Sequence, residues 1–209
     1  MTEYLTEQEQ IQQLKNWVKQ YGPTIVIGIA LALGITSIWN YWQSYREKVL
    51  VHASGVYDEM LSLRAEGNTN ASLVQAQKLM THYANTPYAQ MGAFIIARDA
   101  VLKKDYSEAI TQLNWVINNS KDKSMREIAR LRIARIYIEE KKPEKALQIV
   151  KKADDKNFMG MIDEVKGDAY LAMNDKDSAR NSYQLALKEL PNAEVTRPIL
   201  QMKYDNLAK

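Results

Sequence analysis

The sequence predicts an all-α protein in which one N-terminal transmembrane helix precedes a short solenoid of helical hairpins. Three observations support this fold class. A long uncharged run lies near the N-terminus, short polar turns recur through the rest of the chain, and helix-favouring residues are plentiful while Gly (8) and Pro (5) are scarce. We expect a tail at residues 1–20, the transmembrane helix at 21–45 and the repeat domain at 46–209.

The uncharged run has the length of a membrane span. No charged residue occurs between Lys19 and Arg46, and the apolar centre is the 19 residues from Thr24 to Trp42. As a helix this centre is about 28 Å long at roughly 1.5 Å per residue, which matches a bilayer core of roughly 30 Å. Gly22-Pro23 would begin the helix, because proline is tolerated in a first turn. The ends are flanked by aromatic residues of the kind that favour headgroup levels, namely Trp17, Tyr21, Trp39, Tyr41 and Trp42.

Two other interpretations of this run fit less well. A cleaved signal would have a short basic start and a small-residue cleavage site, whereas about twenty residues with three acids precede this run and bulky IWNYW ends it. A buried core helix would usually be shorter or show a polar face. We therefore expect a permanent anchor in the lipid bilayer. Lys15 and Lys19 before the span balance Arg46 and Lys48 after it, so charge alone does not orient it.

Small residues recur along the anchor at a spacing that permits close helix packing. Gly28 with Ala32, and Ala30 with Gly34, follow the small-xxx-small pattern. These four residues are candidates for contact with another membrane helix, although small residues are common in membrane helices in any case.

The segment before the anchor has two possible structures. Thr6 and Glu9 form a capping-box pattern, and the apolar residues that follow, Ile11, Leu14, Trp17 and Val18, share one helical face. The segment is either a short helix at the membrane surface that runs into the anchor or a frayed polar tail.

The composition argues against several functions. The net charge of +3, from 28 basic and 25 acidic residues, is too even to predict nucleic-acid binding. The chain has no Cys, and its two His residues, His52 and His82, lack converging partners for a zinc site or a catalytic base. Asp154 and Asp155 are interpreted as solvated turn residues, and there is no glycine-rich phosphate loop. We expect no enzyme activity, cofactor, metal or small-molecule substrate.

A repeat appears when the chain after the anchor is aligned on the Ala that follows each turn. The turns are AEGNTNAS, KKDYSE, EEKKPE and MNDKDS, and the aligned residues are Ala76, Ala109, Ala146 and Ala179, at spacings of 33, 37 and 33. A period near 34 is that of the tetratricopeptide repeat, a pair of antiparallel helices. The sequence therefore predicts about four such repeats.

The fourth unit shows the repeat pattern best. It has Gly167 and Tyr170 in its first helix, and then Ala179, Tyr183 and Ala186 before Pro191. In the first unit, Arg64 occupies the expected small position, and the 37-residue step predicts an insertion near NNSKDKSM. The last stretch, AEVTRPILQMKYDNLAK, is expected to be a capping helix with Pro198 near its start.

The first helix of each unit should line the concave surface of the array, where a partner would bind. The protein-binding candidates on these helices are Met91, Phe94, Arg98, Leu131, Arg135, Ile138, Met161, Glu164 and Asp168. Met, Phe and Arg suit an adaptable peptide-binding surface. The alternative is that Phe94, Leu131 and Ile138 only pack within the array. The basic stretch KDKSMREIARLRIAR, residues 121–135, is either a solvated face or a contact with an acidic partner or lipid headgroups.

The order and spacing of these features resemble the YfgM-like family of bacterial inner-membrane proteins, which are ancillary subunits of the SecYEG translocon. The resemblance is carried by QLKNWVKQYGPTIVIGIALALGITSIWNYWQSYR, REIARLRIARIYIEEKKPEKALQIV, VKGDAYLAMNDKDSARNSYQLAL and QMKYDNLA, which together extend over nearly the whole chain. It implies a cytoplasmic N-terminal tail, a single inner-membrane span and a periplasmic repeat domain. It also implies association with Sec translocon subunits and with a membrane-anchored periplasmic chaperone, so that newly exported proteins reach chaperones. A scaffold for another envelope assembly or secretion apparatus is the alternative.

Overall fold

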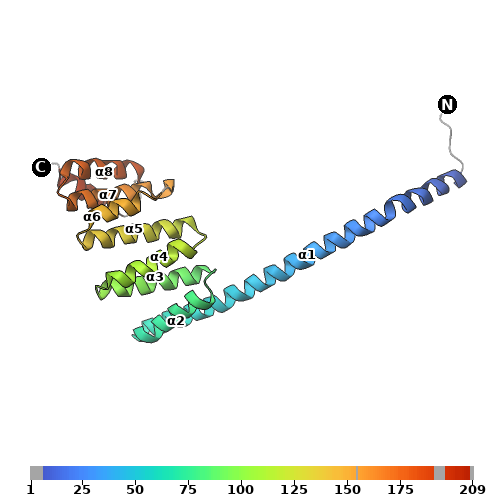
Figure 1. The fold of residues 1–209 in the computed structure, drawn as a ribbon, viewed down its shortest axis with the longest axis horizontal. Helices are drawn as coiled ribbons and strands as arrows, with labels where there is room; N and C mark the ends of the chain where they lie inside the picture. The colour runs from blue at the N-terminus through green and yellow to red at the C-terminus, as the bar shows by residue number, and fades with distance from the viewer. Residues whose placement is uncertain (1–6, 154, 191–195, 208–209) are drawn as a thin grey trace, which may run out of the picture. The chain divides into compact units, whose positions relative to one another are not determined.

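The computed structural model describes residues 7–153, 155–190 and 196–207 and is helical throughout, with no strand in these ranges. Figure 1 shows the helices from α2 to α8 stacked in chain order. This confirms the predicted all-α fold class. The elements are α1 (Glu7–Ala65), α2 (Thr69–His82), α3 (Pro87–Leu102), α4 (Tyr106–Asn119), α5 (Lys123–Glu139), α6 (Pro143–Val150), the 3₁₀ helix η1 (Lys156–Phe158), α7 (Met159–Ala172), α8 (Lys176–Glu189) and α9 (Arg197–Asp205).

The chain divides into two units, residues 1–51 and 52–209, and α1 continues from the first into the second. Within the first unit, α1 contains the one segment of the described chain that is long and apolar enough to cross a membrane. The helix runs through Pro23, so the predicted helix start at Gly22-Pro23 is wrong. The segment before the anchor is helical from Glu7 onward, whereas Thr6 of the predicted capping box lies outside the described residues.

Two hydroxyl groups inside the apolar segment donate to carbonyls of the same helix. The Ser37 hydroxyl donates to the Leu33 carbonyl (2.8 Å), and the Thr36 hydroxyl donates to the Ala32 carbonyl (3.0 Å). A segment in lipid needs such internal partners because hydrocarbon offers none. At the end of the segment, Trp39 and Trp42 lie with ring centroids 5.7 Å apart, and the Arg46 guanidinium lies 4.7 Å from the Trp42 ring centroid.

Four turns in the second unit share one backbone geometry. In each turn a residue of positive φ ends the helix. The N–H of the residue that follows it then donates a hydrogen bond to the carbonyl five residues before that donor. The bonds are Asn68 to Leu63 (2.8 Å), Asp105 to Ala100 (2.8 Å), Lys142 to Tyr137 (2.8 Å) and Asp175 to Tyr170 (2.9 Å). The positive-φ residues are Gly67, Lys104, Lys141 and Asn174.

The residue after each positive φ begins the next helix. The side chains of Asn68, Asp105 and Asp175 each accept a hydrogen bond from a backbone N–H three residues later. The third turn has Lys142 at this position and uses Pro143 as its first helical residue instead. The chain thus forms four helical hairpins: the end of α1 with α2, α3 with α4, α5 with α6, and α7 with α8.

The turn geometry corrects the sequence alignment of the first hairpin. Successive positive-φ residues are 37, 37 and 33 positions apart. The counterpart of Ala109 in the first hairpin is therefore Ser72, which is fully buried, and not Ala76, which lies one helical turn later. Similarly, the residue equivalent to Gly167 is the buried Met60 and not Arg64. The 37-residue step is shared by the first three hairpins, so the expected insertion near NNSKDKSM is wrong. The last step is shorter mainly because α7 has 14 residues whereas α5 has 17.

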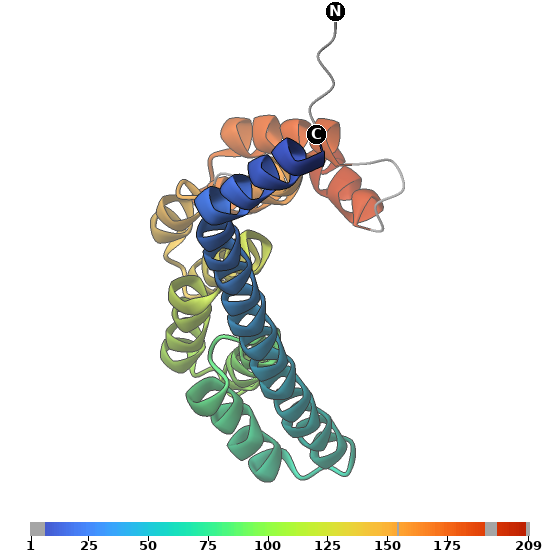
Figure 2. The ribbon, with the colours of Figure 1, turned by 90° about the vertical axis from the view of Figure 1, so that its right-hand side faces the viewer.

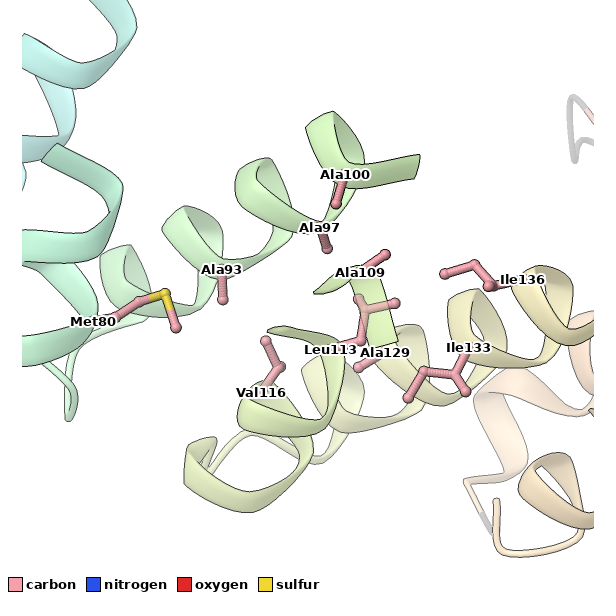
Figure 3. Close-up of a cluster of buried hydrophobic side chains, with 10 residues drawn as sticks. All are labelled: Met80, Ala93, Ala97, Ala100, Ala109, Leu113, Val116, Ala129, Ile133 and Ile136. Atoms are coloured by element: carbon pink, nitrogen blue, oxygen red, sulfur yellow. The ribbon is translucent and has the colours of Figure 1, made fainter. Parts of the chain in front are cut away.

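Consecutive hairpins share their cores. Figure 3 shows one buried cluster that draws on α2, α3, α4 and α5, with Met80, Ala97, Leu113 and Ile133 among its members. Figure 2 shows the helices of successive hairpins adjoining one another in the same order as in Figure 1. Because each hairpin buries its apolar residues against the next, the array is stabilised by contacts between neighbours. In the first hairpin, Ala53, Val56 and Met60 of α1 pack with Ala76 and Leu79 of α2.

Tyr183 and Gly167 lie in close contact in the last hairpin. Tyr183 is fully buried, and a Cβ placed on Gly167 would overlap its ring. The sequence pattern placed these two residues in the first and second helices of the unit, and the structure shows that they lie against each other. Gly55, by contrast, has open space where a Cβ would lie.

We predict that Gly167→Ala lowers the free energy of unfolding by about 1–3 kcal/mol, because the added methyl group must displace the Tyr183 ring. Gly55→Ala is the matched control and should stabilise the helix by about 0.5–1 kcal/mol. Urea unfolding of the full-length protein in detergent, followed by circular dichroism, measures both. Equal effects of the two substitutions would contradict the tight contact.

Candidate protein-binding surface

The first helices of the last three hairpins lie beside one another, since α5 contacts both α3 and α7. Residues one repeat apart therefore form rows across these helices. One row contains Arg98, Arg135 and Asp168, and the next contains Phe94, Leu131 and Glu164. Six of the nine predicted protein-binding residues belong to these two rows.

The structure places the predicted residues at different depths. Arg98 and Arg135 are exposed, and Leu131 is buried with only 2% of its surface exposed. Leu131 packs with Ala134 and Ala146 in the core, which is the alternative that the sequence left open for it. The remaining candidates are partly buried, namely Met91, Phe94, Ile138, Met161, Glu164 and Asp168. Whether these residues bind a partner stays a prediction.

A hollow of about 280 Å³ lies between α3 and α5. Its floor is apolar and includes the buried residues Ala97, Leu113 and Ile136. Its lining also includes two exposed apolar side chains of α3, Val101 and Leu102, and the last of these is 70% exposed. Three arginines complete the lining: Arg98 from α3, and Arg132 and Arg135 from α5.

Arg132 is held against the apolar wall. Its guanidinium carbon lies 4.5 Å from the centroid of the Phe94 ring, within the range of a cation–π contact. Partial burial of the guanidinium lowers the pKa of Arg132, and the positive charge of Arg135 acts in the same direction. Both effects disfavour the protonated, charged form of Arg132, so an anion bound nearby would stabilise that form.

The opposite end of the same surface is occupied by α9. The Lys203 ammonium donates to Glu164 Oε1 (2.8 Å) and to Asp168 Oδ1 (2.8 Å) of α7. The Tyr183 hydroxyl donates to Asp168 Oδ1 as well (2.8 Å), and Arg135 Nη2 lies 4.0 Å from Glu164 Oε2. The two acidic binding candidates are thus already paired within the chain.

The pairing shifts two ionisation equilibria. Burial of the Lys203 ammonium works against its charge, but the hydrogen bonds to Asp168 and Glu164 outweigh burial, and the pKa of Lys203 is raised. Burial also raises the pKa of the Tyr183 phenol, and the adjacent Asp168 carboxylate raises it further. Both groups keep their protons at neutral pH, so the contact between α9 and α7 is intact there.

Arg132 and Lys203 were not among the protein-binding residues predicted from the sequence, although Arg132 lies within the basic stretch 121–135. Arg132 had a usable signal, because it lies three residues before Arg135 and so shares a helical face with it. Lys203 had none, since it meets Asp168 from 35 residues away. The other arginines of the basic stretch serve the fold: Arg126 donates to the Ser120 carbonyl (2.8 Å), and Arg130 pairs with the buried Glu127 (2.7 Å).

The remaining candidates lie elsewhere. Gly28, Ala30, Ala32 and Gly34 are exposed on α1, and a Cβ at either glycine would meet no atom within 4 Å. Their role in packing against another membrane helix stays a prediction. His52 and His82 are exposed on different helices, and Asp154 lies outside the described residues.

Comparison with known proteins agrees with this architecture. The family described as tetratricopeptide repeat-like domain matches residues 15–209. The chain belongs to this family. The match begins before the apolar segment, so the family's pattern includes both units of the chain.

Relatives of this repeat protein are similar over nearly their whole length. A Haemophilus influenzae protein is 26% identical over 97% of this chain and 98% of its own. An Escherichia coli K12 protein is 24% identical over 98% of both chains, and a Neisseria gonorrhoeae protein is 27% identical over 99% of this chain and 100% of its own. Each of the three is named ancillary SecYEG translocon subunit. The resemblance to the YfgM-like family is thereby confirmed.

We predict that Lys203→Met lowers the free energy of unfolding by about 1 kcal/mol at pH 7, because Glu164 and Asp168 lose their cation. The folded-state pKa of Lys203 is raised, so its contribution is complete below the unfolded value near 10.4 and is lost as pH rises through the folded value. Unfolding of the wild-type and Lys203→Met proteins at pH 7, 9 and 11 measures this contribution. The difference between their free energies of unfolding should be smaller at pH 11 than at pH 7. Lys188→Met, at an exposed position of α8, is the control and should have little effect at any pH. A difference that is constant up to pH 11 would contradict the ion pair.

Proposed function

We propose that this protein is a membrane-anchored scaffold that associates with the Sec protein-export channel. The observation that carries the proposal is the extent of the similarity: relatives named ancillary SecYEG translocon subunit match 97–99% of this chain, from the apolar helix to the last repeat. A shared repeat domain alone would support only a shared fold. Similarity that also includes the anchor supports a shared location and shared membrane partners.

The proposal assigns a role to each part of the chain. Residues 21–45 span the bacterial inner membrane once, residues 1–20 form a cytoplasmic tail, and residues 46–209 form a periplasmic domain. The exposed apolar side chains of the span, such as Ile35 (67%) and Ile38 (72%), support burial in lipid. The repeat surface, with exposed Arg98 and Arg135, offers a site for other proteins without any catalytic step.

A second partner belongs to the same proposal. The resemblance to the YfgM-like family implies a membrane-anchored periplasmic chaperone, to which newly exported proteins would pass. An anchored scaffold keeps both partners at one membrane surface, which raises their effective concentration toward each other.

Purification of the tagged full-length protein from inner membranes in mild detergent, followed by mass spectrometry, tests the proposal. We expect SecY and SecE subunits, and a periplasmic chaperone with its own membrane anchor, at levels well above an untagged control. A matched control carries an unrelated transmembrane segment in place of residues 21–45 and should recover less SecY. Recovery of a different envelope assembly, with no Sec subunit in several detergents, would overturn the proposal.

The absence of Cys allows a direct test of orientation. We predict that Asn181→Cys, at an exposed position of α8, reacts with a membrane-impermeant maleimide in cells with a permeabilised outer membrane. Gln8→Cys, exposed near the start of α1, should react only after the inner membrane is lysed. The reverse pattern would place the repeat domain in the cytoplasm.

A further inference from the structure

We infer that the hollow between α3 and α5 binds a segment of a partner protein in which a large apolar side chain lies next to a carboxylate. This inference builds on the proposed scaffold function and names the chemistry that the scaffold recognises. The apolar floor, formed in part by Ala97, Leu113 and Ile136, selects the apolar side chain, and Arg98, Arg132 and Arg135 select the carboxylate.

The size and lining of the hollow favour one side chain over a small molecule. Its volume of about 280 Å³ is at or below the lower end of small-molecule sites, which span roughly 300–1,000 Å³. The exposed Leu102 at its edge adds apolar surface that only a partner would cover. A Leu, Ile or Phe side chain from another protein fits such a space and displaces water from it.

Two of the three arginines that line the hollow have no ion-pair partner among the described residues. No ion pair joins Arg98 or Arg132 to a carboxylate anywhere in residues 7–153, 155–190 and 196–207, and Arg135 has only Glu164 at 4.0 Å. Glu164 in turn is shared with Lys203 at 2.8 Å. Guanidinium groups bind carboxylates through paired hydrogen bonds, so the arginines can hold an Asp or Glu side chain in a defined orientation.

The charge pattern also favours a protein over a lipid surface. The basic end of the surface, at Arg98 and Arg132, is followed by an acidic end at Glu164 and Asp168 that Lys203 only partly neutralises. An anionic bilayer would be attracted to the basic end and repelled by the acidic end. An acyl chain is also longer than a hollow of this volume can bury.

Fluorescence anisotropy with the full-length protein in phosphatidylcholine nanodiscs tests the inference. The probe is a fluorescein-labelled octapeptide with the core Asp-Leu-Phe-Asp between Ser and Gly residues. We expect a Kd on the order of 10–100 μM, rising with salt concentration because the contact is charged. A peptide with Asn in place of both Asp residues, and one with Ala in place of Leu and Phe, should each bind at least about fivefold more weakly.

Variants of the protein separate the arginines from the apolar floor. Arg98→Gln with Arg132→Gln should weaken binding about tenfold or more, whereas Lys78→Gln, at an exposed position of α2, should not change it. Val101→Trp fills the hollow without a change in charge and should also abolish binding, and its unfolding transition shows whether the fold is kept.

Each contrary outcome overturns the inference. Equal affinity for the Asp and Asn peptides, equal loss in the Lys78→Gln protein, or unchanged binding to a folded Val101→Trp protein would each rule out recognition at this hollow. A double variant that loses binding only to phosphatidylglycerol vesicles, with peptide binding intact, would show that lipid is the ligand.

The inference and the proposed function fail separately. If the peptide binds but no Sec subunit is recovered with the wild-type protein, the hollow is a binding site and the Sec assignment is wrong. If no peptide binds but Sec subunits are recovered equally with the wild type and the double arginine variant, the Sec assignment stands. The hollow is then not the site through which the protein associates with Sec.

Discussion

Close approach of neighbouring helices is the constraint on which the repeat domain depends. Small residues lie where helices come closest: Gly92 of α3 lies against the backbone of Ala76 in α2, where an added Cβ would lie 3.1 Å from a carbonyl oxygen. The same contacts leave the aromatic and aliphatic side chains of each hairpin to fill the space before the next one. Because this packing fixes the spacing of α3, α5 and α7, residues one repeat apart are held in rows, and a binding surface follows from the core.

The repeat is uniform in backbone geometry and variable in charge. All four turns close through a residue of positive φ, although Gly occurs at only one of them. The outward-facing row changes from Arg98 and Arg135 to Asp168 across successive units. A solenoid can vary exposed positions such as Arg98 and Arg135 with little cost to the core, whereas Asp168 accepts a hydrogen bond from the buried Tyr183. The charge pattern can therefore be suited to a partner while the scaffold stays the same.

The two units place their apolar residues in different surroundings. In the second unit the core clusters bury apolar side chains against neighbouring helices, whereas the apolar side chains of residues 24–42 remain exposed in the chain itself. The apolar segment is helical throughout, and the hydroxyls of Thr36 and Ser37 donate to carbonyls of the same helix. Such a segment needs lipid or another apolar helix around it, which is the physical basis for the proposed anchor.

The sequence alone determined the all-α fold, the apolar segment and the four turns, because each depends on residues near in sequence or on a local period. It misplaced the first repeat by one helical turn, since Ser72 and Ala76 are both small and only the turn at Gly67 decides between them. Tertiary structure alone decided that Leu131 is buried, that Lys203 pairs with Glu164 and Asp168, and that Arg132 joins Arg98 beside an apolar hollow. These contacts join residues tens of positions apart, and no local pattern encodes which of many similar side chains will meet.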